Sequence, residues 1–253
     1  TWNPPELIPP DTVSGFDAVV NLAGEPVAPG RWTSERKKRI LSSRINTTRA
    51  LVQSMQQAQK RPRVLVSASA VGYYGPHNDE YVTEETPPGS DFLADVCVKW
   101  EAEAFRAEAL NIRVVTVRLG AVLGADGGAL PRMVLPFKLF LGGPIGSGRQ
   151  WFSWIHIDDV AGIIRFALEN NAVSGPVNAT APTPVTNRDF SSALGRALHR
   201  PSCLPVPAFM VRLIFGEMGE MLLTGQRVLP DKALKAGYRF KYADLDDALK
   251  AIL

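Results

Sequence analysis

The sequence predicts an α/β protein built around a doubly wound, parallel β-sheet. Three short apolar runs, residues 16–22, 63–67 and 112–117, are separated by two long stretches of helical periodicity. Continuous apolar runs are typical of strands that are covered by helices on both faces of a sheet. Alternating strands and helices form βαβ units, which are right-handed in nearly all known cases.

The first run, FDAVVNL, ends at Ala23-Gly24, and we expect it to be buried on both faces. Helices are expected from about 33 to 59 and from about 92 to 110. In the second helix, apolar residues recur at steps of three and four, which predicts one buried face. These residues are Leu93, Val96, Cys97, Trp100, Ala104 and Phe105, and the opposite face carries Glu103 and Arg106.

Beyond Gly124 the pattern predicts a smaller, mixed C-terminal lobe. Helices are expected near 130–141, 158–169, 187–198 and 208–223, with a short strand at 177–179. We assign residues 1–141 to the core and 142–253 mainly to the lobe, with residues around 151–170 packing back on the core. Asp158 is the expected N-cap of the helix through Glu169, and Asp159 favours the same helix start through the helix dipole.

Composition excludes several classes of protein. The 253 residues carry a net charge of +3, with two cysteines and three histidines. No CxxC or HxxxH motif indicates a metal site or a disulfide scaffold, and a reducing cytoplasm fits best. No apolar run approaches the roughly 18 residues of a membrane span. Residues 31–49 hold seven basic residues and one acidic residue, a pattern that fits nucleic acid, but a solvated helix face is expected instead.

Four motifs follow the predicted strands or open a helix. They are Asn21-Leu22-Ala23-Gly24, the segment from Ser67 to Gly75 (SASAVGYYG), the segment from Arg118 to Gly124 (RLGAVLG), and WIHIDDVA from Trp154. Ligands of doubly wound sheets bind at the carboxyl ends of the strands, where small residues let a ligand approach the backbone. Taken alone, Asn21–Gly24 could equally be an ordinary turn from a strand into a loop.

In this order, and with a helix bearing Lys99, the motifs resemble those of the extended short-chain dehydrogenases/reductases, the NAD(P)-dependent epimerases and dehydratases. LAGEPVA, VSASAVGYYG, GGPIGSG, WFSWIHIDD and GQRVLP are similar to one atypical branch, the "epimerase family proteins" also labelled cell-division inhibitors. The resemblance implies a Rossmann fold that lacks its first βαβ segment in this chain. Thr1 is not an initiator Met, so we expect a truncated start with the glycine-rich phosphate loop upstream, and weak NADP(H) binding or poor folding by these residues alone.

The resemblance also implies NADP(H) as the cofactor, with NAD possible. The residues that it places at the cofactor are Asn21, Leu22, Ala23, Gly24, Arg44, Ser67, Ala68, Lys99, Leu119, Gly120 and Val122.

The catalytic residues depart from the family pattern. In the family, a Tyr four residues before the Lys moves the proton and a Ser polarises the substrate oxygen, but here Asp95 stands four residues before Lys99. Ser69 would act on the substrate, and Tyr73 or Asp95 would have to move the proton. Carboxyl groups have an ordinary pKa of about 4 and are poor acids at neutral pH. The alternative is that Asp95 and Lys99 form a helix-surface ion pair.

The substrate is expected to be a small molecule other than a nucleotide sugar. The Arg that holds the nucleotide in the family is absent near Phe152 and Ser153, and the Asn after the third strand is replaced by Ala121. Aromatic residues suggest an apolar ligand, or alternatively a packed lobe core. The candidates are Tyr74, Phe92, Trp151, Phe152 and Trp154, although Tyr74 is equally a turn residue. His156 could be a base, but a packing role beside the helix start is expected.

Two functions therefore remain open. The first is an NADP(H)-binding oxidoreductase or epimerase-like protein with an unknown small-molecule substrate. The second is a catalytically weak dinucleotide sensor or scaffold that acts through a protein partner. A homodimer is compatible with either function, whereas nucleic-acid or membrane binding is not expected.

Overall fold

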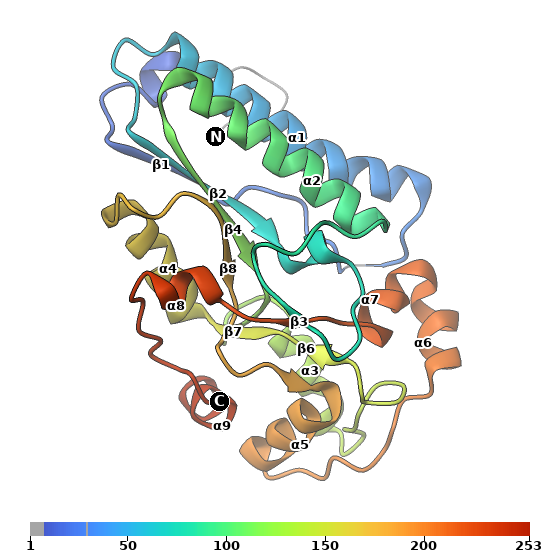
Figure 1. Ribbon diagram of the computed structural model, residues 1–253. Coiled ribbons are helices and arrows are strands. Elements are labelled where there is room, and N and C mark those ends of the chain that lie inside the picture. The colour runs from blue at the N-terminus through green and yellow to red at the C-terminus, as the bar shows by residue number, and fades with distance from the viewer. Residues whose placement is uncertain (1–7, 29) are drawn as a thin grey trace.

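The computed structural model describes residues 8–28 and 30–253, so the expected loop at Thr1–Pro5 lies outside the described residues. At its centre is a four-stranded parallel sheet (Figure 1), in the order β1-β2-β4-β8. The strands are β1 (Ala18–Asn21), β2 (Val64–Ala70), β4 (Arg113–Leu119) and β8 (Gly175–Ala179). The predicted α/β class is confirmed, and the three predicted apolar runs coincide with β1, β2 and β4.

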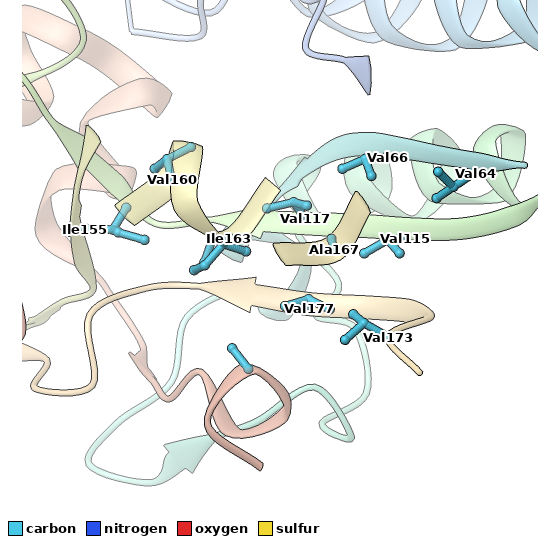
Figure 2. Close-up of a cluster of buried hydrophobic side chains, with 12 residues drawn as sticks. Val64, Val66, Val115, Val117, Ile155, Val160, Ile163, Ala167, Val173 and Val177 are labelled. Carbon is cyan, nitrogen blue, oxygen red and sulfur yellow. The ribbon is translucent and has the colours of Figure 1, made fainter. Parts of the chain in front are cut away.

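Helices cover both faces of the sheet, as a doubly wound architecture requires. The helices α1 (Ser34–Gln57) and α2 (Phe92–Phe105) lie side by side on one face (Figure 1). On the other face, α4 (Ile157–Glu169) packs Val160, Ile163 and Ala167 against valines of β2 and β4 (Figure 2). Thr33 caps α1 and Asp91 caps α2, each through its side-chain oxygen.

The prediction that the first strand is buried on both faces is wrong. Val20 of β1 is 41% exposed, and Ala18 and Val19 are only half-buried. The physical reason is position: among the described residues β1 is the outer strand of the sheet, with a strand partner on one side only.

The predicted N-cap of α4 is also wrong, because His156 takes that place. The neutral ring nitrogen Nδ1 of His156 accepts a hydrogen bond from the backbone N–H of Asp158 at 3.0 Å. Asp158 lies inside the first turn and pairs with Lys241. Asp159 is buried and accepts hydrogen bonds from the backbone of the C-terminal segment, so it holds that segment to the core.

A second hydrophobic cluster joins residues from Leu123 to Phe137 with more C-terminal residues that include Trp154, Phe190 and Leu249. The lobe and its connections contain β5 (Ala121–Leu123), α3 (Leu130–Lys138), β6 (Trp151–Phe152), β7 (Trp154–His156), β9 (Val185–Thr186), α5 (Asn187–Leu198), α8 (Asp231–Lys235) and α9 (Leu245–Ile252). A short parallel pair joins β3 (Tyr81–Val82) to β10 (Arg227–Val228).

Three predicted helices are shorter in the structure. The helix expected over 208–223 is broken at Gly216, whose φ is 59°, into α6 (Ala208–Phe215), the 3-10 turn η4 (Gly216–Gly219) and α7 (Glu220–Leu223). The helix expected to reach 110 ends as η3 (Arg106–Leu110), and α3 ends at Lys138. Two further 3-10 turns are η1 (Pro10–Thr12) and η2 (Val71–Tyr74). None of the helices in the described part of the chain is both long and apolar enough to cross a membrane.

Candidate functional site

Most of the predicted site residues lie at the carboxyl ends of the parallel strands. In the register of the sheet, Asn21 of β1 lies opposite Ser67 of β2, and Ala70 of β2 lies opposite Leu119 of β4. The three strands therefore end along one edge, which is where doubly wound sheets bind their ligands.

A buried polar network fixes the backbone that follows β1. The Asn21 side chain donates to Thr48 Oγ1 at 3.0 Å and to Ser67 Oγ at 3.4 Å, and it accepts from the backbone N–H of Ala23. The indole N–H of Trp100 donates to the same Thr48 oxygen at 3.0 Å. Because buried amides and hydroxyls are costly when unpaired, this network holds the segment after β1 in one position.

Arg44 lies directly behind this segment. Its Nη1 donates to the carbonyls of Glu25 and Ile40, each at 3.0 Å, and its guanidinium lies 5.0 Å from the ring centre of Trp100. A Cβ at Gly24 would lie 3.2 Å from Arg44 Cζ, so the absence of a side chain at Gly24 allows this close packing. Burial lowers the pKa of Arg44, although the charge of nearby Glu25 raises it, and Arg44 forms no salt bridge with the described residues. The edge therefore carries a partly desolvated cation that no salt bridge to a described residue holds.

Ser69 is placed below the surface of the edge. It is 1% exposed, and its hydroxyl donates to Glu101 Oε1 at 2.6 Å. The last residue of β2 is Ala70, which is half-buried. As the structure stands, the Ser69 hydroxyl is hydrogen-bonded to Glu101 of α2.

Glu101 is the centre of a buried charged cluster under the site. Arg118 binds it through two hydrogen bonds, Nε to Oε1 at 2.8 Å and Nη2 to Oε2 at 2.9 Å. Arg118 Nη1 also donates to the Tyr74 hydroxyl at 3.0 Å, and that hydroxyl donates to Asn178 Oδ1 at 2.6 Å. Burial raises the pKa of Tyr74 to about 12, so its phenol stays protonated. The cluster links β2, α2, β4 and β8.

Tyr73 differs from its neighbour. Its ring centre lies 3.4 Å from the Arg118 guanidinium, and it meets Tyr74 edge-on with ring centres 5.4 Å apart. Tyr73 is half-buried, and its phenol makes no hydrogen bond to the described residues. It is therefore a positioned aromatic ring whose hydroxyl is not engaged by any described residue.

Asp95 and Lys99 form an ion pair on α2. Lys99 Nζ lies 2.7 Å from Asp95 Oδ2, and the two side chains are 50% and 51% exposed. This geometry is that of the expected (i, i+4) helix-surface pair.

The remaining predicted cofactor residues differ in exposure. Leu22 is 57% exposed, whereas Ala68 is buried within the sheet. Leu119 and Val122 pack against the core that lies between the sheet and α4. A Cβ at Gly120 would lie 2.5 Å from the carbonyl oxygen just before β7, so only glycine fits there.

Two of the predicted substrate residues belong to separate aromatic groups. Phe92 packs edge-on against Trp32 with ring centres 5.2 Å apart, and Lys37 Nζ lies 5.0 Å from the Phe92 ring centre. Trp151 stacks against the guanidinium of Arg227 at 4.1 Å.

Trp154 belongs to the second hydrophobic cluster, and Phe152 packs against that cluster. The ring centre of Phe152 lies 4.4 Å from that of Phe190. Trp154 is fully buried, and its indole N–H donates to the Thr183 carbonyl at 3.1 Å. The structure thus brings Asn21, Arg44 and Tyr73 to the strand ends, but it does not gather the aromatic candidates into one pocket.

Sequence reasoning missed Thr48, Glu101 and Asn178. Thr48 lies on the buried face of α1, where the recurrence of Ile40, Leu41 and Ile45 could have drawn attention to it. Glu101 and Asn178 had no local signal, since their partners come from other strands and helices.

Two family models match the chain. Residues 10–179 match the NAD dependent epimerase/dehydratase family, and residues 206–252 match a domain of unknown function, DUF1731.

Curated relatives match nearly the whole chain. The epimerase family protein YfhF of Bacillus subtilis is 44% identical over 253 residues, which is 100% of this chain and 83% of the relative. The Arabidopsis thaliana protein named epimerase family protein SDR39U1 homolog, chloroplastic, is 48% identical over 95% of this chain and 70% of its own length.

A solved structure agrees with these matches. The crystal structure of human epimerase family protein SDR39U1 (isoform 2) with NADPH has a TM-score of 0.91 and 42% identity. The match covers 97% of this chain and 86% of the human one. The parallel sheet, the strand-end site and these matches agree, and the chain belongs to the NAD dependent epimerase/dehydratase family, among the epimerase family proteins of the extended short-chain dehydrogenases/reductases.

Proposed function

We propose that the chain binds NADP(H) along the carboxyl edge of its sheet and acts on a small carbonyl or hydroxyl compound. The observation that carries this proposal is the human relative, which was crystallised with NADPH and matches 97% of the chain. The edge fits such an anionic group, because Arg44 is a partly desolvated cation that forms no salt bridge with the described residues, and the missing side chain at Gly24 lets Arg44 lie against the backbone there. Asn21, Ala23, Gly24 and Arg44 would hold it.

When bound, NADP(H) supplies or accepts a hydride. The protein must then move a proton at the substrate oxygen. We assign that proton to the Tyr73 hydroxyl, since Arg118 fixes its ring and no described residue engages the hydroxyl. Lys99 would orient the nicotinamide ribose, for which it must leave Asp95.

Ser69 has a smaller part in this proposal than the motif implies. Its hydroxyl donates to Glu101 and would have to turn to reach a substrate. The substrate is proposed to be other than a nucleotide sugar. Near Phe152 and Ser153, where the family resemblance places a nucleotide-binding Arg, Phe152 packs against Phe190 instead.

The test measures binding and turnover separately. Enhanced NADPH fluorescence would report binding, and NADPH oxidation with a panel of aldehydes and ketones would report turnover. Tyr73→Phe is expected to lower turnover at least about 100-fold, the usual contribution of an acid–base group, with little change in binding. The Asp95→Asn variant tests the alternative proton donor in the same assay. Unaltered turnover in Tyr73→Phe would refute Tyr73 as the proton donor.

A second candidate is a dinucleotide sensor that acts through a protein partner. It is favoured by the engagement of Ser69 with Glu101 and of Lys99 with Asp95, which leaves no preformed catalytic set. This candidate predicts NADPH binding without turnover of any compound, and Tyr73→Phe without effect.

A further inference from the structure

The segment 208–223, made of α6, η4 and α7, is only weakly buried. Of its side chains, those of Val211 and Met218 alone are buried. Four apolar side chains of α6 are 41% to 69% exposed, and they are Phe209, Met210, Leu213 and Ile214. A segment that buries little apolar surface opens at low free-energy cost and depends on its polar contacts to stay closed.

Two of those polar contacts come from the segment after β1. Arg31 Nε donates to the Ile214 carbonyl at 3.0 Å, and Arg31 Nη2 donates to the Leu213 carbonyl. These are terminal carbonyls of α6, which lack partners within the helix and favour a cation. Lys37 Nζ lies 2.5 Å from Glu217 Oε1 in η4. We call Arg31, Lys37 and Glu217 the clasp.

The clasp ties residues 208–223 to elements that flank the candidate site. Arg31 and Lys37 follow the Asn21–Gly24 segment, and Lys37 also contacts Phe92 at the start of α2. Past the other end of the segment, the Gln226 side chain donates to the Val71 carbonyl, just beyond the end of β2, at 2.7 Å. Figure 1 shows α6 and α7 beside the ends of α1 and α2. The segment therefore bridges two sides of the edge that we propose for NADP(H).

Residues 228–232, which follow this segment, are held by buried contacts. Val228 is fully buried, and its N–H donates to Ser153 Oγ at 3.0 Å. The Leu229 carbonyl accepts from the Asn178 side chain, and the N–H of Lys232 donates to Glu84. This part is anchored in the core, so the weakly held residues 208–223 can move while it stays in place.

We propose that residues 208–223 are a flap that closes the candidate site and that the clasp sets how often the flap opens. Residues 208–223 lie at the start of residues 206–252, which match a domain of unknown function, so the flap would be a role for this part of the chain. The identity of the ligand rests on the proposed function. Opening breaks the two Arg31 hydrogen bonds and the Lys37–Glu217 pair. The hydrogen bonds from Gln150 to the Leu222 carbonyl and from Gln226 to the Val71 carbonyl remain as contacts on the hinge side.

The first test measures NADPH association and dissociation rates by stopped-flow fluorescence. In the full chain, Arg31→Ala/Lys37→Ala is expected to raise both rates about fivefold, because the three contacts that it removes are exposed and individually weak, with affinity nearly unchanged. A direct ligand contact would instead raise dissociation alone and weaken binding. That result, or unchanged rates, overturns the proposal. Arg212→Ala is the matched control, because it removes the Arg212–Glu220 pair inside the flap without touching the clasp.

The second test needs no ligand. Hydrogen exchange of the backbone amides in 211–217 is expected to be several-fold faster in the double variant than in the wild type. The variant Lys37→Glu/Glu217→Lys swaps the two charges and keeps the ion pair, so hydrogen exchange at η4 should stay as slow in it as in the wild type. Unchanged exchange refutes the flap even in a protein that binds no dinucleotide, whereas failure of the wild type to bind NADPH refutes the proposed function alone.

Discussion

The buried Glu101–Arg118 pair is the interaction whose loss should most destabilise the protein. The two side chains are 6% and 3% exposed and are joined by two short hydrogen bonds. Glu101→Gln keeps the shape of the side chain but removes its charge. Because arginine does not lose its proton, the variant leaves a buried cation without a counter-ion and turns an amide N–H toward an N–H donor.

Removing one partner of a buried ion pair costs about 3–5 kcal/mol. For a chain of this size, 1 kcal/mol shifts the melting temperature by about 2–4 °C. The Glu101→Gln variant should therefore melt about 6–20 °C below the wild type. The underlying loss of about 3–5 kcal/mol is a large part of a total stability of about 5–15 kcal/mol.

The assay is urea unfolding followed by circular dichroism, with thermal melting beside it. Lys99→Gln is the control on the same helix, because its pair with Asp95 is half exposed and worth at most about 1 kcal/mol. The apolar double variant Glu101→Leu/Arg118→Met should recover much of the loss, since neither charge then remains buried. A Glu101→Gln protein within about 1 kcal/mol of the wild type would refute the reasoning.

Three further predictions concern pH, reactivity and packing. Burial lowers the pKa of His156, so the folded protein favours the neutral imidazole. The neutral ring therefore adds to the free energy of unfolding above pH about 6.5, and this contribution is lost as the pH falls below that value. His156→Asn should lose less stability than the wild type between pH 7.5 and 5.5 in urea titrations, and parallel losses would contradict this. Burial raises the pKa of the Cys97 thiol to about 12, so a thiol reagent should label exposed Cys203 quickly and Cys97 only after denaturation. A Cβ at Gly89 would lie 2.7 Å from the Tyr74 carbonyl oxygen, so Gly89→Ala should destabilise by about 1–3 kcal/mol, whereas Gly127→Ala, which meets nothing within 4 Å, should be near neutral in the same assay.

The central sheet could be predicted because its signal is local. Each strand is a short apolar run, and each covering helix shows its own periodicity, so no distant contact was needed to recognise β2, β4, α1 or α2. The error at β1 is of another kind. A run such as FDAVVNL predicts a strand, but the exposure of Val20 depends on which neighbours the strand has.

The site was harder to predict, because its chemistry depends on contacts between distant residues. Ser69 stands in a motif that places it at a strand end, and the motif does not show that Glu101 of α2 accepts its hydrogen bond. Glu101 itself looked like either of the two acidic residues in KWEAEAF. Its role follows from Arg118 on the neighbouring strand, which no spacing within α2 predicts.

The outer position of β1 has a consequence for handling the protein. Among the described residues β1 pairs only with β2, and Val20 in β1 and Leu22 just after it are 41% and 57% exposed. An unpaired strand with apolar neighbours recruits strands from other molecules. Wherever that edge is left uncovered, the protein is expected to aggregate as its concentration rises. Light scattering as a function of concentration would therefore show whether the edge of β1 is covered, without any catalytic assay.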